Sequence, residues 1–103
     1  MSAVKPILGI IGGGQLGSML ATAAKKINIK TVVISDDEAA PAKNFCDKFI
    51  YAKYNNEDKI DEFVQASNIV TFEFENIPYE TLKKISQKRP VFPDPSINKI
   101  IPV

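Results

Sequence analysis

The sequence lacks histidine altogether and contains a single cysteine, Cys46. Without a second cysteine no disulfide can form within the chain, and a reducing cytoplasm is the simplest compartment for it. Without histidine, neither a Ser-His or Cys-His catalytic pair nor an ordinary transition-metal site is expected. Because Cys46 follows Phe45 among small residues, we expect a packed thiol rather than a reactive one.

Long apolar runs and an excess of one charge are also missing. The longest apolar stretches fall far below the roughly 20 residues that a membrane-spanning helix needs. The N-terminal segment around Lys5 contains no long apolar region ending in a cleavage site, so secretion is not indicated. Thirteen basic and twelve acidic residues leave a formal charge of +1, and no basic run is interleaved with aromatic residues. We therefore expect neither a membrane nor a nucleic acid as partner.

An α/β pattern fills the 103 residues, a length typical of one domain. Apolar runs alternate with segments of helical periodicity, which predicts a three-layer, Rossmann-like fold with a mainly parallel sheet of about five strands. The predicted strands are 6–11, 30–35, 49–52, 69–72 and 91–92. The predicted helices are 15–27, a short one near Pro41, 56–66, 78–87, and one that begins at Ser96. We expect residues 1–95 to form this domain and 96–103 to begin a helix leading to domains absent from the chain.

The first predicted helix has apolar residues at helical spacing. Its inward face is predicted to consist of Leu16, Leu20, Ala23, Ala24 and Ile27, with Met19 extending it as a core residue.

A glycine turn separates the first predicted strand from this helix. Gly12, Gly14 and Gly17 follow the G-x-G-x-x-G spacing, which suits a tight turn, a close approach of a ligand to the backbone, and close helix packing. The helix presents its free N–H groups and positive dipole end at this turn. We therefore expect an anion near residues 13–17. A phosphate, a pyrophosphate or a carboxylate would each fit, and a purely structural role for the glycines remains open.

Acidic residues close two of the other predicted strands. Asp36 and Asp37 follow the second strand, where dinucleotide-binding proteins place a ribose-binding carboxylate, although two aspartates there also form a simple turn. Glu73 and Glu75 follow the fourth strand. Because side chains alternate along a strand, Thr71, Glu73 and Glu75 face one way and the phenylalanines the other.

The carboxyl ends of parallel strands form one edge of the sheet, so the glycine loop and Glu73 are predicted to line one crevice. A buried carboxylate needs a hydrogen-bond or charge partner. A hydroxyl or amine of a ligand would serve Glu73, and a phosphate would serve the helix end. Glu75 could equally cap a neighbouring helix.

Three segments together resemble a known family. They are Ile10 to Gly17 (I-I-G-G-G-Q-L-G), Thr71 to Asn76 (T-F-E-F-E-N) and Phe92 to Ser96 (F-P-D-P-S). They are similar to the N-terminal, preATP-grasp domain of N5-carboxyaminoimidazole ribonucleotide synthases, which are purine-biosynthesis ligases of the ATP-grasp superfamily. The resemblance covers nearly the whole chain.

The resemblance implies a ligase reaction for the complete enzyme. ATP activates bicarbonate as carboxyphosphate, and the carboxyl group passes to the exocyclic amine of 5-aminoimidazole ribonucleotide, which yields ADP and phosphate. The family implies that ATP and Mg²⁺ bind to later domains, so no cofactor, metal or catalytic residue is expected in this chain, which alone should be inactive. It further implies a cytoplasmic homodimer.

The substrate-binding residues implied by the resemblance are Gln15, Leu16 and Glu73, because matching positions in a related transformylase contact its phosphoribosyl substrate. Gly14 is added from the loop itself. Two alternatives stay open at this point. One is an NAD(P)-binding Rossmann domain of a dehydrogenase or regulatory protein that uses the glycine loop and Asp36. The other is an interaction domain whose glycine turn only packs.

Overall fold

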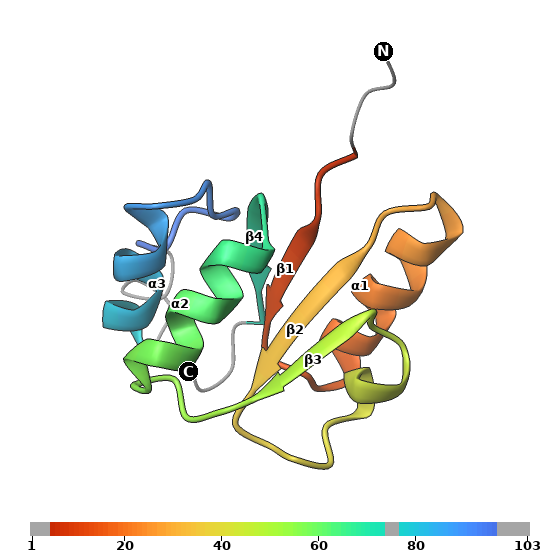
Figure 1. Ribbon diagram of the computed structural model, residues 1–103, viewed down its shortest axis with the longest axis horizontal. Coiled ribbons are helices and arrows are strands. Elements are labelled where there is room, and N and C mark those ends of the chain that lie inside the picture. The colour runs from red at the N-terminus through yellow and green to blue at the C-terminus, as the bar shows by residue number, and fades with distance from the viewer. Residues whose placement is uncertain (1–4, 74–76, 97–103) are drawn as a thin grey trace.

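The computed structural model describes residues 5–73 and 77–96. Its centre is one parallel sheet in the order β3-β2-β1-β4 (Figure 1). The strands are β1 (Leu8–Ile11), β2 (Thr31–Ser35), β3 (Lys48–Tyr51) and β4 (Ile69–Phe72). In register, Ile10 of β1 lies beside Val33 of β2 and Thr71 of β4. The chain thus builds outward from β1 through β2 and β3 and then returns to the other side of β1. The strand order therefore reverses between β1 and β4, where open α/β sheets bind their ligands.

The described part of the sheet has four strands, so the predicted count of five is wrong. Val91 forms only an isolated parallel bridge with Val70. The Val70 N–H donates to the Pro90 carbonyl, and the Phe92 N–H donates to the Val70 carbonyl. Pro90 lacks the N–H that would extend this pairing toward the start of β4. The predicted strand at 91–92 is therefore reduced to a single bridge.

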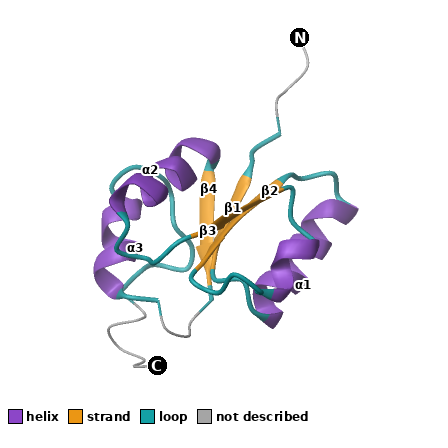
Figure 2. Ribbon diagram, turned by 60° about the horizontal axis from the view of Figure 1, so that its bottom comes forward, coloured by secondary structure: helices purple, strands orange, loops and turns teal. Residues whose placement is uncertain are grey.

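Helices cover both faces of the sheet, which confirms the three-layer arrangement (Figure 2). One face carries α1 (Gln15–Lys26) and the 3-10 helix η1 (Pro41–Asn44), and the other carries α2 (Glu57–Ala66) and α3 (Tyr79–Ser86). The Asn56 side chain caps α2 by accepting a hydrogen bond from the Lys59 N–H at 3.1 Å. These bounds lie within two residues of the predicted ones. The helix predicted from Ser96 falls on residues 97–103, outside the described part.

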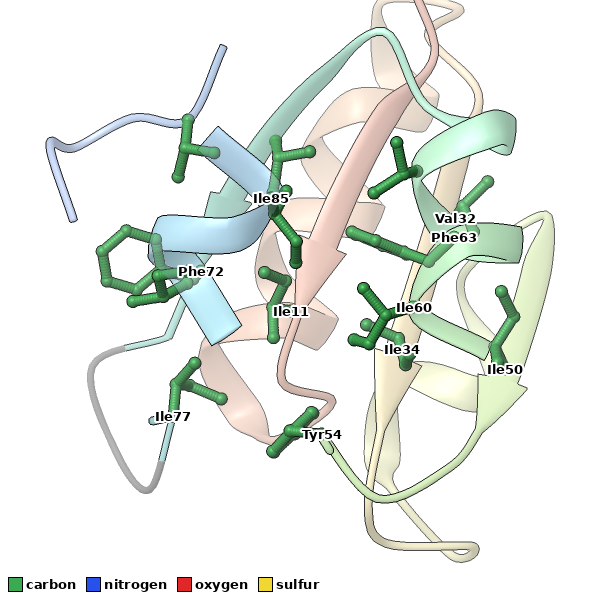
Figure 3. Close-up of a cluster of buried hydrophobic side chains, with 14 of the residues drawn as sticks. Ile11, Val32, Ile34, Ile50, Tyr54, Ile60, Phe63, Phe72, Ile77 and Ile85 are labelled. Atoms are coloured by element: carbon green, nitrogen blue, oxygen red, sulfur yellow. The ribbon is translucent and has the colours of Figure 1, made fainter. Parts of the chain in front are cut away.

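The larger hydrophobic core lies between the sheet and the pair α2 and α3 (Figure 3). Its largest fully buried side chains are Phe63 of α2 and Phe72 of β4. A smaller cluster of Ile10, Ala21, Val33 and Ala42 joins the opposite face to α1 and η1. Together these cores fix the strand ends, and hence the loops that follow them, relative to one another.

The predicted inward face of α1 is largely wrong. Its buried residues are Gly17, Ala21 and Ala24, of which only Ala24 belongs to the predicted face. Leu16, Met19 and Ile27 are instead 41%, 61% and 62% exposed. Ala23 is exposed as well, and Leu20 is half-buried. The physical reason is close approach, because a Cβ on Gly17 would already collide with the Gly12 carbonyl oxygen, and small residues therefore occupy the positions of α1 nearest the sheet, with Leu20 packed beside them.

Candidate functional site

The glycine loop makes a tight turn from β1 into α1. Gly12 is buried with φ of +103°, a conformation that residues with a side chain rarely adopt. Its N–H donates to the Ile34 carbonyl at 2.8 Å, which extends the pairing of β1 with β2. Helix α1 then begins after Gly14, whose N-cap position has no side chain to accept a hydrogen bond, and its first turn contains no acidic residue. The helix therefore has no acceptor of its own for its first N–H groups.

Glu73 supplies that acceptor from the far side of the crevice. The Gly17 N–H donates to the Glu73 Oε1 atom at 2.7 Å, a short distance typical of a bond to a charged group. The backbone N–H of Glu73 donates to the Ile11 carbonyl at 2.9 Å. Glu73 is thus tied to β1 through its main chain and to α1 through its side chain. The anion at the helix N-terminus is one that the chain itself provides.

The glycines fit closely around this carboxylate. A Cβ atom on Gly12 would lie 2.7 Å from Glu73 Oε2, and one on Gly14 would lie 3.1 Å from Glu73 Oε1. A Cβ on Gly17 would collide with the carbonyl oxygen of Gly12. The glycines therefore serve the tight turn and the close helix packing that their spacing predicted, and the group that approaches the backbone is Glu73 rather than the expected ligand.

The structure brings together two of the four predicted substrate-binding residues, Gly14 and Glu73. Gln15 and Leu16 lie in the first turn of α1 with exposed side chains. Thr71 and Glu73 are both half-buried, whereas Phe72 is buried in the opposite core, as the predicted alternation requires. Glu75 lies outside the described residues.

Asp36 and Asp37, which follow β2, have different surroundings. Asp37 forms a turn, because its N–H donates to Ser35 Oγ at 3.1 Å and its Oδ1 accepts from the Ala39 N–H at 2.9 Å. Asp36 is exposed. It lines an open hollow of about 390 Å³ together with Tyr51, Lys53, Tyr54, Asn55 and Pro78. The simple turn that the sequence allowed is therefore present at Asp37.

Tyr54 lines this hollow and also a larger one between α2 and α3, and nothing in the sequence marked it. It is 8% exposed and lies at the end of the main core toward which β1 points (Figure 3). Burial raises the pKa of the Tyr54 phenol to about 12, and the nearby negative charges of Asp36 and Glu73 add to the rise. The Thr81 hydroxyl donates to the Tyr54 carbonyl at 3.0 Å, which fixes the residue to α3. Tyr54 therefore stays a neutral phenol between two acidic side chains.

A larger hollow of about 740 Å³ runs between α2 and α3. Its charged side chains pair with one another, with Lys84 Nζ 2.6 Å from Glu57 Oε1 and Lys88 Nζ 3.3 Å from Asp61 Oδ1. The contact with Lys84 lowers the pKa of the exposed Glu57 carboxyl. Opposite charges therefore face each other across this groove.

Cys46 is half-buried, and burial raises the pKa of its thiol, which agrees with an unreactive cysteine. Among the residues that the structure describes, no three acidic or cysteine side chains are arranged to hold a metal ion. None of the described helices is long and apolar enough to cross a membrane.

The position of Glu73 disfavours the dinucleotide alternative. A Rossmann fingerprint uses the same helix N-terminus for a pyrophosphate. Here the Glu73 carboxylate already accepts the Gly17 N–H and lies against Gly12 and Gly14. A pyrophosphate in that position would meet a like charge at contact distance.

Comparison with known proteins shows the family of the chain. A model of the ribonucleotide synthetase preATP-grasp domain family matches residues 5–102. The chain belongs to this family. The N5-carboxyaminoimidazole ribonucleotide synthase of Staphylococcus epidermidis is 44% identical over 80 residues, which are 78% of this chain and 21% of that protein. The enzyme of the same name from Staphylococcus haemolyticus is 41% identical over 81 residues, which are 79% and 22% of the two chains.

Solved structures of N5-carboxyaminoimidazole ribonucleotide synthetases match this fold. The N5-carboxyaminoimidazole synthetase of Staphylococcus aureus complexed with ADP matches with a TM-score of 0.79 and 38% identity, over 88% of this chain and 25% of that one. The synthetase from Thermus thermophilus matches with a TM-score of 0.86 and 28% identity, over 91% and 26% of the two chains. The chain therefore spans about a fifth of the length of these curated relatives and about a quarter of the solved chains.

Proposed function

We propose that this chain is the N-terminal, substrate-binding domain of an N5-carboxyaminoimidazole ribonucleotide synthase. The complete enzyme would use ATP and bicarbonate to carboxylate 5-aminoimidazole ribonucleotide, with ADP and phosphate as the other products. The observation that carries the proposal is the anchored carboxylate of Glu73, at the point where the strand order reverses, in a chain of this family.

Each residue of the crevice has a distinct role in this proposal. Glu73 uses Oε1 to accept the Gly17 N–H, which leaves Oε2 to accept hydrogen bonds from the ribose hydroxyls or from the aminoimidazole amine. Because Gly14 has no side chain, it leaves room for the ligand to reach that carboxylate. Gln15 and Leu16 contact the nucleotide from the rim of the crevice.

The remaining parts of the enzyme belong to the proposal as well. ATP and Mg²⁺ would bind in domains that follow this one, so this chain would contribute no group to the activation of bicarbonate. We also propose a homodimer in the cytoplasm, as the family resemblance implies. Light scattering on the complete enzyme checks the dimer, and a monomer at working concentration would contradict it.

A chimeric enzyme tests the function. In it, residues 1–103 of this chain replace the matching N-terminal segment of the Staphylococcus epidermidis synthase. We expect ADP release from ATP that depends on both 5-aminoimidazole ribonucleotide and bicarbonate. Glu73→Ala should lower kcat/KM for the ribonucleotide at least about tenfold, because hydrogen bonds to a charged acceptor are lost. Glu57→Ala, which removes an exposed carboxylate on α2, serves as the matched control and should retain activity.

The outcomes separate the site from the function. Turnover unaffected by Glu73→Ala would keep the enzyme and remove Glu73 from its site. A folded chimera without substrate-dependent ADP release would contradict the function. Quenching of NADH fluorescence by the 103-residue chain would revive the dinucleotide alternative.

A further inference from the structure

We propose that Glu73 is a specificity-determining residue that acts as the resident anion of the glycine loop and excludes the phosphate of the ligand from it. The ribonucleotide would then enter this crevice through neutral hydrogen-bond donors, and its phosphate would be held elsewhere. This inference deepens the proposed function and rests on it for the identity of the ligand. The exclusion of phosphate itself concerns only residues of this chain.

The first support for the exclusion of phosphate is the hydrogen bonding at the N-terminus of α1. Helix α1 has neither a capping side chain at Gly14 nor an acidic residue in its first turn. Such a helix end attracts an anion through its free N–H groups and its dipole. Glu73 Oε1 meets this demand with a 2.7 Å contact to the Gly17 N–H. The electrostatic requirement of the loop is thus satisfied before any ligand arrives.

The second support is the close packing of the Glu73 carboxylate against the glycine loop. The Glu73 carboxylate lies so near Gly12 and Gly14 that even one added carbon on either glycine would come within 3.1 Å of its oxygens. A phosphate group is larger than that carbon and bears a charge of the same sign as Glu73. It could reach the loop only by displacing the side chain, which the main-chain bond from Glu73 to Ile11 keeps close by.

The third support is the chemistry of the second carboxylate oxygen, Glu73 Oε2. A carboxylate is purely an acceptor, so its free oxygen selects hydroxyl and amine donors and repels phosphate oxygens. The loop and Glu73 together therefore convert a phosphate-binding motif into a site for sugar hydroxyls or an amine. Gly17 is a positioning residue in this arrangement, because its N–H orients the carboxylate without touching the ligand.

Titration of the 103-residue chain with inorganic phosphate, followed by amide NMR, tests the exclusion. For the wild-type chain we expect no saturable shifts at the amides of residues 13–17. Glu73→Ala should open the loop, so that these amides shift with a phosphate affinity at least about tenfold above wild type, equivalent to about 1.4 kcal/mol. Glu73→Gln keeps most of the side-chain volume without its charge, and it should bind phosphate with an affinity between the two.

The matched control is Asp36→Ala, which removes one negative charge from the same edge of the sheet, after β2 rather than beside the loop. It should leave the loop as unresponsive to phosphate as the wild type. Equal gains in Asp36→Ala and Glu73→Ala would show general electrostatics and overturn the proposal. Phosphate binding at the wild-type loop would overturn it too, as would a lack of binding in both Glu73 variants.

These results are independent of turnover. An inactive chimera together with a phosphate-binding Glu73→Ala chain would reject the proposed function and keep the exclusion. If the chimera were active but the wild-type chain bound phosphate at its loop, the proposed function would stand and the exclusion of phosphate would be rejected.

Discussion

At Glu73 the main chain and the side chain bind different elements, β1 through Ile11 and α1 through Gly17. The position of this residue at a strand end could be predicted from the alternation of Thr71, Phe72 and Glu73. Its partner could not, because Gly17 lies 56 residues away and a backbone N–H leaves no trace in sequence composition. The sequence thus indicated that Glu73 lies at the same edge of the sheet as the loop but not that the loop holds its carboxylate.

Tyr54 was not marked by any motif, since its role depends on burial between segments that only the fold brings together. Its phenol has a pKa of about 12 in the folded chain against 10.0 for an ordinary tyrosine. Below pH 10 both states are protonated and this difference has no effect on stability. Between pH 10 and about 12 the unfolded phenol loses its proton while the folded one retains it.

We therefore expect the free energy of unfolding to fall by about 1.4 kcal/mol per pH unit in that window through Tyr54 alone. Tyr54→Phe should lack this part of the slope, and Tyr51→Phe, which alters an exposed tyrosine, should keep it. Urea unfolding at a series of pH values measures the difference. Identical slopes for wild type and Tyr54→Phe would contradict the prediction.

At the scale of elements, helix α1 shows where periodicity misleads. Met19 is 61% exposed, whereas Ala21 is 1% exposed against β1. Met19→Lys should therefore change the free energy of unfolding by less than about 0.5 kcal/mol. Ala21→Lys should lower it by about 2–4 kcal/mol, because a charged side chain would have to enter a packed contact. Urea unfolding of the two variants compares them directly, and equal losses would show that α1 packs as its apolar pattern suggested.

The other elements were predictable because their signals are local. Alternating apolar runs and the Asn56 cap placed β1 to β4 and α2 within two residues of their observed bounds. Two expectations failed for reasons that are not local. The count of strands failed because Pro90 lacks the N–H that would extend the pairing of Val91 with β4. The prediction for the inward face of α1 failed because close packing against a strand favours small residues, whereas the periodicity was read from the large apolar ones.

For the whole molecule, the comparisons place this chain at about a quarter of a solved synthetase chain. Among its described residues no metal-binding cluster exists. We expect the 103-residue chain alone to release no ADP from ATP in the presence of 5-aminoimidazole ribonucleotide and bicarbonate. A coupled ADP assay with the chimera as positive control measures this, and ribonucleotide-dependent turnover by the chain alone would contradict it.

The bond between Gly17 and Glu73 also sets an order of events during synthesis. The glycine loop leaves the ribosome long before Glu73, which follows the last strand of the sheet. Contacts between such distant residues form late, after the intervening loop has closed. Until β4 is in place, the Gly17 N–H has no Glu73 carboxylate to bind. The pairing of β4 with β1 therefore also brings the Glu73 carboxylate to the glycine loop, and the exclusion of phosphate depends on that pairing.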